Sequence, residues 1–182
     1  MGLINSKLFS AAALSLAATF FISAHAATRY VSPSGSQVSP YTSWATAARV
    51  IQDAVDAAVD GDEIVVTNGT YFTGGRAVAG TNFFGTNLLV SRVAVDKQLV
   101  LRSVNGPRVT IIDGQRSVRC VALASNAVLS GFTLTNGFIN RSGGGVFCES
   151  LTTVVSNCTL TTELTERSRP VMLSSATAIS KT

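Results

Sequence analysis

The chain has 182 residues, of which 46% are hydrophobic and 13% are charged, and its formal net charge is +4. Its basic residues are dispersed and few aromatic residues lie among them, which argues against nucleic-acid binding. The only histidine is His25, and it lies in an N-terminal segment that we expect to be removed. The rest of the chain therefore has no Ser-His-Asp triad and no histidine-based zinc site.

Residues 1–26 have the features of a secretory signal peptide. Lys7 supplies a positive charge, Leu8–Ile22 is an apolar run, and Ala24 and Ala26 are small residues at the two positions that a signal peptidase reads. The run is shorter than the roughly 20 residues that cross a bilayer, and an uncleaved N-terminal anchor is the alternative. We expect cleavage after Ala26 and a mature chain that is secreted or held at the cell surface, with no stable membrane span.

A lead-in segment at 27–42 contains one short predicted strand, Arg29–Val31, and precedes a predicted amphipathic helix. Thr42 or Ser43 is expected to cap the start of this helix, which continues to about Val59, and Gly61 supplies the left-handed residue that ends it. One face is apolar at helical spacing and comprises Trp44, Ala47, Ala48, Ile51, Ala54, Val55 and Ala58.

From Glu63 onward the apolar residues recur with a period of about two, which is typical of strands. Turn residues such as Asn68-Gly69 and Asp113-Gly114 separate the apolar runs. No helix is expected after Gly61, so the body of the chain is predicted to be all-β. The predicted strands are Ile64–Val66, Leu88–Val90, Val93–Val95, Leu99–Leu101, Val109–Ile112, Cys120–Leu123, Val128–Thr135, Gly145–Cys148 and Val154–Leu160.

Two of these segments repeat each other. Val128–Thr135 is followed 26 residues later by Val154–Thr161, and Cys120 aligns with Cys148 at a spacing of 28. Self-similarity at a spacing of roughly 20–50 residues marks a stacked repeat. A β-sandwich would not explain it, whereas a parallel β-helix stacks like side chains above one another around one core. The predicted fold is therefore an all-β solenoid, a parallel β-helix.

Several stretches also carry a resemblance: Asp60-Gly61-Asp62-Glu63-Ile64-Val65-Val66, Asn68-Gly69-Thr70-Tyr71, Leu99–Ser103, Val109–Gly114, Leu129–Leu134 and Gly143–Val146. They are similar to successive coils of right-handed parallel β-helix proteins of the pectate-lyase-like superfamily, in particular its bacterial, exported, repeat-rich members. The resemblance covers about residues 41–161. It implies a right-handed β-helix and leaves the function open, because the superfamily includes lyases, hydrolases and adhesins.

The first coil of a β-helix is open, with exposed apolar surface and unpaired strand edges. We expect the predicted helix to cover that end, with Trp44, Ile51 and Val55 as the residues that plug it. A membrane-binding or partner-binding helix is the alternative. The capping helix and the first coils are thus expected to occupy 43–161.

Residues 162–182 depart from the repeat and are expected to form an aberrant, disordered tail. Val171–Ser180, back-translated and read two bases later, permits a sequence similar to the coil that ends at Leu160. We therefore expect a shifted reading frame and a truncated solenoid. A naturally divergent terminus is the alternative.

The three cysteines, Cys120, Cys148 and Cys158, lie in apolar strand segments and are expected to be buried thiols, with one disulfide as the alternative. Asp60-Gly61-Asp62-Glu63 is expected to be a helix end and a turn, because the ligand spacing of a calcium loop is absent. No metal site and no cofactor is predicted. Three glycosylation sequons are interpreted as turn asparagines: Asn68-Gly69-Thr70, Asn140-Arg141-Ser142 and Asn157-Cys158-Thr159.

Between Lys97 and Arg141 the sequence contains several basic residues and a single acidic one, Asp113. If several of them share one face of a coil, they would bind an acidic glycan such as a polyuronate through bidentate arginine–carboxylate contacts. Solvated loop charges are the alternative. The candidate ligand-binding residues are Arg102, Arg108, Arg116 and Arg119.

No pair of carboxylates recurs at one coil position, so no catalytic residue is predicted. The predicted function is that of an exported, non-catalytic β-helix scaffold of the surface or adhesion type, whose partner is a polysaccharide or a cell-surface glycan. The alternative is the N-terminal fragment of a polysaccharide lyase or glycoside hydrolase whose catalytic coils are missing from this chain.

Overall fold

The computed structural model describes residues 26–82, 85–139, 143–161 and 164–165. These residues form short strands, mostly in parallel sheets, and one helix, α1 (Ile51–Ala57). The prediction of a mainly β chain is confirmed. The signal peptide expected at 1–26 lies outside the described residues except for Ala26, as does the tail expected at 162–182 except for 164–165.

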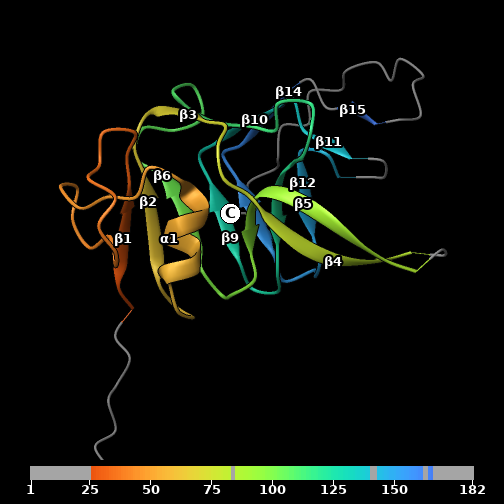
Figure 1. Ribbon diagram of the computed structural model, residues 1–182, viewed down its shortest axis with the longest axis horizontal. Coiled ribbons are helices and arrows are strands. Elements are labelled where there is room, and N and C mark those ends of the chain that lie inside the picture. The colour runs from red at the N-terminus through yellow and green to blue at the C-terminus, as the bar shows by residue number, and fades with distance from the viewer. Residues whose placement is uncertain (1–25, 83–84, 140–142, 162–163, 166–182) are drawn as a thin grey trace, which may run out of the picture.

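Three sheets hold most of the strands (Figure 1). In spatial order, the first sheet consists of β1 (Thr28–Val31), β2 (Glu63–Val66), β6 (Val100–Ser103), β9 (Val128–Ser130) and β13 (Val154–Ser156). The second sheet consists of β3 (Gly69–Tyr71), β7 (Thr110–Asp113), β10 (Thr133–Thr135) and β14 (Thr159–Thr161). The third consists of β4 (Arg76–Asn82), β5 (Gly85–Val95), β8 (Arg119–Leu123) and β12 (Val146–Cys148). A further pair joins β11 (Phe138–Ile139) to β15 (Leu164–Thr165).

The chain visits the first, second and third sheets in the same order three times, through β2–β3–β5, β6–β7–β8 and β9–β10–β12. All strand pairs among the described residues are parallel except β4 with β5. Figure 1 shows β1, β2, β6 and β9 following one another across the molecule, with α1 beside them. Strands that are neighbours in a sheet therefore come from successive passages of the chain.

The 26-residue repeat corresponds to the register between neighbouring strands. Val128 is the Cα partner of Val154 in the first sheet, and Thr133 is the partner of Thr159 in the second. The same spacing continues beyond Thr161, since Phe138 is the partner of Leu164. The repeat thus extends into the segment that we expected to depart from it at residue 162.

The predicted alignment of Cys120 with Cys148 is wrong. Cys148 is the Cα partner of Leu123, and the spacing in the third sheet is 25 residues, as between Val121 and Val146. Register along a parallel ladder is set by the backbone bonds and by which side chains point inward, not by residue identity. Cys120 points into the core and is fully buried, whereas Cys148 is exposed.

Apolar side chains at equivalent positions stack in columns and form one hydrophobic core. Ile64, Leu101 and Leu129 are Cα partners in β2, β6 and β9, and each is fully buried. Ile112 and Leu134 form a second buried column in β7 and β10. The burial of each such side chain stabilises the fold by about 1.5–3 kcal/mol.

The helix is shorter than the prediction. It covers Ile51–Ala57, whereas residues 43–50 form turns and bends. The backbone of Ala48 pairs with β1 instead, because Ser32 N donates to Ala48 O at 2.8 Å and Ala48 N donates to Tyr30 O at 2.9 Å. The hydroxyls of Ser43 and Thr46 accept each other's backbone N–H groups, an alternative to helical pairing that these residues favour.

Two of the three residues expected to plug the open end are buried. Ile51 and Val55 are 2% and 0% exposed and belong to the hydrophobic core. Trp44 is 44% exposed, so the prediction is wrong for this residue. Because 43–50 is not helical, Trp44 does not lie on the same face as Ile51 and Val55.

The segment before β6 also differs from the prediction. We expected separate short strands at Leu88–Val90 and Val93–Val95, whereas β5 is one long strand that pairs with β4 in an antiparallel hairpin, seen to extend from the body in Figure 1. The small residues of β4 give no clear alternation, so the pattern did not reveal this strand. Within the described residues, no helix is long and apolar enough to cross a membrane.

Candidate functional site

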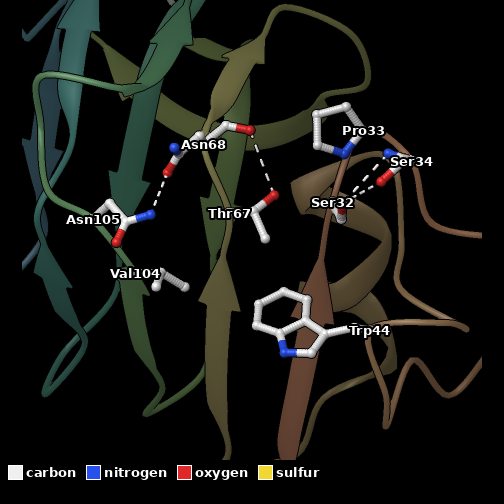
Figure 2. A pocket seen from close by; sticks show the side chains of 8 residues that line it. All are labelled: Ser32, Pro33, Ser34, Trp44, Thr67, Asn68, Val104 and Asn105. Atoms are coloured by element: carbon white, nitrogen blue, oxygen red, sulfur yellow. Dashed lines mark hydrogen bonds between the residues drawn. The ribbon is translucent and has the colours of Figure 1, made fainter.

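An open groove of about 750 Å³ lies where three strands of the first sheet end. Parallel neighbours have their carboxyl ends at the same edge, so the residues that follow β1, β2 and β6 gather there. Trp44 joins them from the segment between β1 and α1 (Figure 2). We call this site the sheet-end groove; it is lined by Ser32, Pro33, Ser34, Trp44, Thr67, Asn68, Val104 and Asn105.

Two asparagines from neighbouring strand ends are paired in the groove. Asn105 Nδ2 donates a hydrogen bond to Asn68 Oδ1 at 2.7 Å, as Figure 2 shows. A primary amide has two donors and an acceptor with two lone pairs, so the pair keeps hydrogen-bonding capacity for a ligand. Asn68 belongs to a glycosylation sequon, and its side chain is here hydrogen-bonded to the asparagine of the neighbouring strand end.

The other side of the groove combines hydroxyls with an aromatic ring. Ser32 Oγ and Ser34 Oγ are 3.0 Å apart. The Trp44 ring packs edge-to-face on Tyr30, with ring centroids 4.4 Å apart, and still leaves 44% of Trp44 exposed. Tyr30 therefore holds an indole surface that a ligand can reach. None of the 8 lining residues is charged.

The structure distributes the four candidate arginines over two sheets and two connections. Arg102 lies in β6, where Nε and Nη2 donate to the two carboxylate oxygens of Glu63 at 2.7 and 3.2 Å. This hydrogen-bonded contact raises the pKa of Arg102 above its ordinary value. Arg108 and Arg116 are exposed in the β6–β7 and β7–β8 connections.

Arg119, the fourth candidate, is buried in β8 and 3% exposed. Its Nε donates to Gly143 O at 2.8 Å, and its guanidinium lies 4.6 Å from the centroid of the Phe147 ring. Burial lowers the pKa of Arg119. Of the four arginines, Arg108 and Arg116 are the two whose side chains are exposed and have no hydrogen-bond or ion-pair partner among the described residues.

The acidic residues near α1 serve the fold. Asp62 is fully buried, and its carboxylate accepts hydrogen bonds from Ala27 N, Val59 N and Arg29 Nε at 2.7, 3.0 and 3.0 Å. Burial alone raises the pKa of Asp62, but the two backbone N–H groups and the Arg29 guanidinium together bring it below its ordinary value. Asp60 accepts from Gln98 N at 3.0 Å.

These carboxylates point to different partners. Residues 60–61 form the expected turn, but α1 ends at Ala57, so this segment is not the end of the helix. In the described part of the chain, no group of three His, Cys, Asp or Glu residues is placed to hold a metal ion. The cysteines vary in burial. Cys120 is buried and donates to Thr135 O at 3.2 Å, whereas Cys158 is half-buried and Cys148 is exposed, so the expected burial is wrong for Cys148.

Sequence reasoning did not find the sheet-end groove. The helical spacing placed Trp44 on the apolar face of a helix, and Asn68 and Asn105 have the character of turn residues. Their common position directly after strands of one sheet was the available signal. No family model, no curated protein and no solved structure matches this chain.

Proposed function

We propose that this chain is an exported, non-catalytic surface scaffold with a right-handed parallel β-helix fold, and that it binds a glycan in the sheet-end groove. The observation that carries the binding proposal is the exposed indole of Trp44 beside the hydrogen-bonded amides of Asn68 and Asn105. Separate structural observations support the fold and the ligand class, and the signal-peptide features of residues 1–26 support the export.

The order of the strands supports the β-helix. The chain passes through the three sheets in a constant order, and equivalent residues stack between passages. Examples are Thr133 on Thr159, and Ser156 Oγ, which donates to Ser130 Oγ at 3.1 Å. Right-handed connections between parallel strands are strongly preferred, which supports the handedness. α1 supports a capped first coil, since its buried residues join the same core.

The groove lining supports a neutral glycan. A sugar ring has an apolar face of C–H groups and a rim of hydroxyls. The indole of Trp44 offers a flat apolar surface to the first, and the asparagine amides and serine hydroxyls offer donors and acceptors to the second. Because no charged residue lines the groove, a neutral ring fits it better than a polyuronate.

The acidic-glycan prediction and the enzyme alternative are tested alongside. Arg108 and Arg116 are the exposed members of the predicted arginine set, and they lie in connections outside the groove lining. A polysaccharide lyase or glycoside hydrolase would need its catalytic residues in coils beyond this chain. Both predictions therefore require a readout that is independent of the groove.

Trp44 is the only tryptophan of the chain, so its fluorescence reports directly on the groove. The experiment titrates neutral oligosaccharides (glucan, mannan, xylan) and acidic ones (oligogalacturonate, alginate) and follows Trp44 emission and binding heat. We expect a neutral glycan to change the emission, and Trp44→Leu to weaken binding about tenfold or more. Asn105→Ala, added to Trp44→Leu, should weaken glycan binding further. Phe72→Ala removes an exposed aromatic side chain outside the groove lining and should leave glycan binding unchanged.

Absence of binding to any neutral glycan, or binding that survives Trp44→Leu and Asn105→Ala, would contradict the groove proposal. Binding of acidic glycans that is lost in Arg108→Ala and Arg116→Ala would support the arginine prediction instead. Shortened oligosaccharides in the reaction mixture would contradict the non-catalytic proposal and would place catalytic residues within this chain.

A further inference from the structure

The backbone nitrogen of Ala27 is held by a buried carboxylate. Ala27 N donates to Asp62 Oδ1 at 2.7 Å, and Asp62 is 0% exposed. The other carboxylate oxygen, Oδ2, accepts from Arg29 Nε at 3.0 Å and from Val59 N at 3.0 Å. Ala27 thus has one oxygen of this carboxylate, and Arg29 and Val59 share the other.

Ala27 is also the residue at which the exported chain begins under the proposed function, on which this inference rests. The small residues Ala24 and Ala26 indicate cleavage after Ala26 from sequence alone. In the structure Ala26 is exposed, Ala27 is half-buried, and β1 begins at Thr28. Among the described residues, the first tertiary contact therefore lies at the same nitrogen atom as the expected cleavage position.

We propose that signal-peptide cleavage turns Ala27 N into an α-ammonium group that forms an ion pair with the buried carboxylate of Asp62 and locks β1 into the first sheet. A signal peptidase hydrolyses the Ala26–Ala27 peptide bond with one water molecule. Ala26 leaves with a carboxylate, and the released amine of Ala27 takes up the proton. The amide donor to Asp62 Oδ1 becomes a charged donor at the same position.

A charged donor binds a carboxylate more strongly than an amide does. The charged residues around the new ammonium are Asp62, its partner Arg29, and Glu63, which contacts Ala27 through its backbone N–H, a donor to Ala27 O at 2.9 Å. Glu63 is itself paired with Arg102. Arg29 repels the ammonium, but it contacts the opposite carboxylate oxygen, and the half-exposed position of Ala27 leaves the remaining ammonium hydrogens to water.

The anchored strand is the one that begins the first sheet. β1 pairs with β2 along its whole length, from Thr28 with Glu63 to Val31 with Val66. Arg29 also donates from Nη1 to Pro40 O at 2.8 Å. The Asp62 cluster, which consists of Asp62, Arg29 and the backbone N–H groups of Ala27 and Val59, thus connects β1, the lead-in and the turn after α1. The cleaved, folded chain is therefore expected to be more stable than a chain that keeps residues before Ala27.

The test compares three proteins. The first is residues 27–182 with a free α-amino group at Ala27, the second is the same chain with an Nα-acetyl group, and the third is residues 26–182, which retains Ala26. Acetylation keeps an N–H donor on Ala27 but removes the charge, and retention of Ala26 moves the charge by one residue. We expect the unfolding equilibrium constant to rise about fivefold in both altered forms, the difference between a charged and a neutral hydrogen bond. In Asp62→Asn the three forms should unfold alike.

A second measurement serves if Asp62→Asn does not fold. In the native protein the Ala27 amine should react with an acylating reagent at least about tenfold more slowly than in the urea-unfolded chain, because Asp62 stabilises its protonated form. The ion pair is overturned if the three forms are equally stable when Asp62 is unsubstituted, or if the Ala27 amine reacts at equal rates in the native and unfolded chains. N-terminal sequencing of the exported protein tests the processing step: a first residue other than Ala27 overturns it, and retention of the full chain in the cytoplasm contradicts the export proposal itself.

Discussion

Gln52 of α1 pairs its side-chain amide with the backbone of Ala94 in β5. Gln52 Oε1 accepts from Ala94 N at 2.7 Å, and Gln52 Nε2 donates to Ala94 O at 3.3 Å. The hairpin partner β4 pairs with β5 only as far as Ser91. A single buried side chain therefore satisfies the strand edge at a point where the described residues supply no backbone neighbour on that side, and this contact fixes α1 against the third sheet.

The substitution Gln52→Leu tests the contribution of this contact. It leaves Ala94 N and Ala94 O buried without the partner, so we expect the free energy of unfolding to fall by about 2–4 kcal/mol. Gln98→Leu makes the same chemical change at a more exposed position and should cost less than about 0.5 kcal/mol. Urea denaturation followed by circular dichroism measures both. Equal small effects would mean that water replaces the amide and that α1 is held by its apolar face alone.

Two glycines with the same backbone conformation separate strain from steric overlap. At Gly61 (φ +89°) an added Cβ atom would meet nothing within 4 Å, whereas at Gly131 (φ +86°) a Cβ atom would lie 2.5 Å from Ser103 Oγ. Gly61→Ala should cost about 1–2 kcal/mol from the left-handed conformation alone. Gly131→Ala should cost at least about 1 kcal/mol more, because Ser103 Oγ must also give up the hydrogen bond from Gly106 N.

The control for this pair is the Ser103→Ala background. Removal of the hydroxyl removes the overlap, so the cost of Gly131→Ala should fall to that of Gly61→Ala. A cost that stays high in this background would place the strain in the backbone and not in the contact. Thermal or urea unfolding of the four single and double variants measures each step.

The solvent exposure of β14 can be tested with two equivalent leucines. Leu134 and Leu160 are the same residue at equivalent positions of β10 and β14, yet Leu134 is 0% exposed and Leu160 is 44% exposed. Leu134→Ala should therefore cost about 2–5 kcal/mol, and Leu160→Ala about 1 kcal/mol or less. Equal costs in urea denaturation would reveal that another segment or a second copy covers β14 in solution.

The repeat predicted register well where the residues themselves recur. Val128 and Val154 are neighbours because like side chains occupy like positions in stacked strands, and the sequence carries that information directly. For Cys120 and Cys148 the shared residue type misled the prediction. A cysteine is small enough to stand on either the inward or the outward face of a short strand, so two cysteines need not be strand neighbours.

The helix prediction is wrong for residues 43–50 for a different reason, whereas it holds for Ile51–Ala57. The apolar spacing around Ala47 and Ala48 correctly indicates burial, since both are 0% exposed. Burial does not specify the backbone, and here Ala48 pairs with β1 while local hydroxyl contacts at Ser43 and Thr46 replace helical bonds. The sheet-end groove could not be foreseen without knowing which strands are neighbours, because its residues are far apart in sequence.

The pH dependence of stability tests the Asp62 cluster. The pKa of Asp62 is lower in the folded chain than in the unfolded one, so the stability it contributes is present above the unfolded pKa of about 3.9 and is lost as the pH falls through the folded value. At pH 7 we expect Asp62→Asn to lower the free energy of unfolding by about 3–5 kcal/mol, because it leaves Arg29 buried without its anion. The difference from the unsubstituted chain should shrink below about pH 4. Asp96→Asn breaks only an exposed ion pair with Arg76 (2.9 Å) and should cost less than about 1 kcal/mol. A difference that persists unchanged to pH 2 would show that the hydrogen-bonded shape of the Asp62 side chain, and not its charge, holds the N-terminal strand.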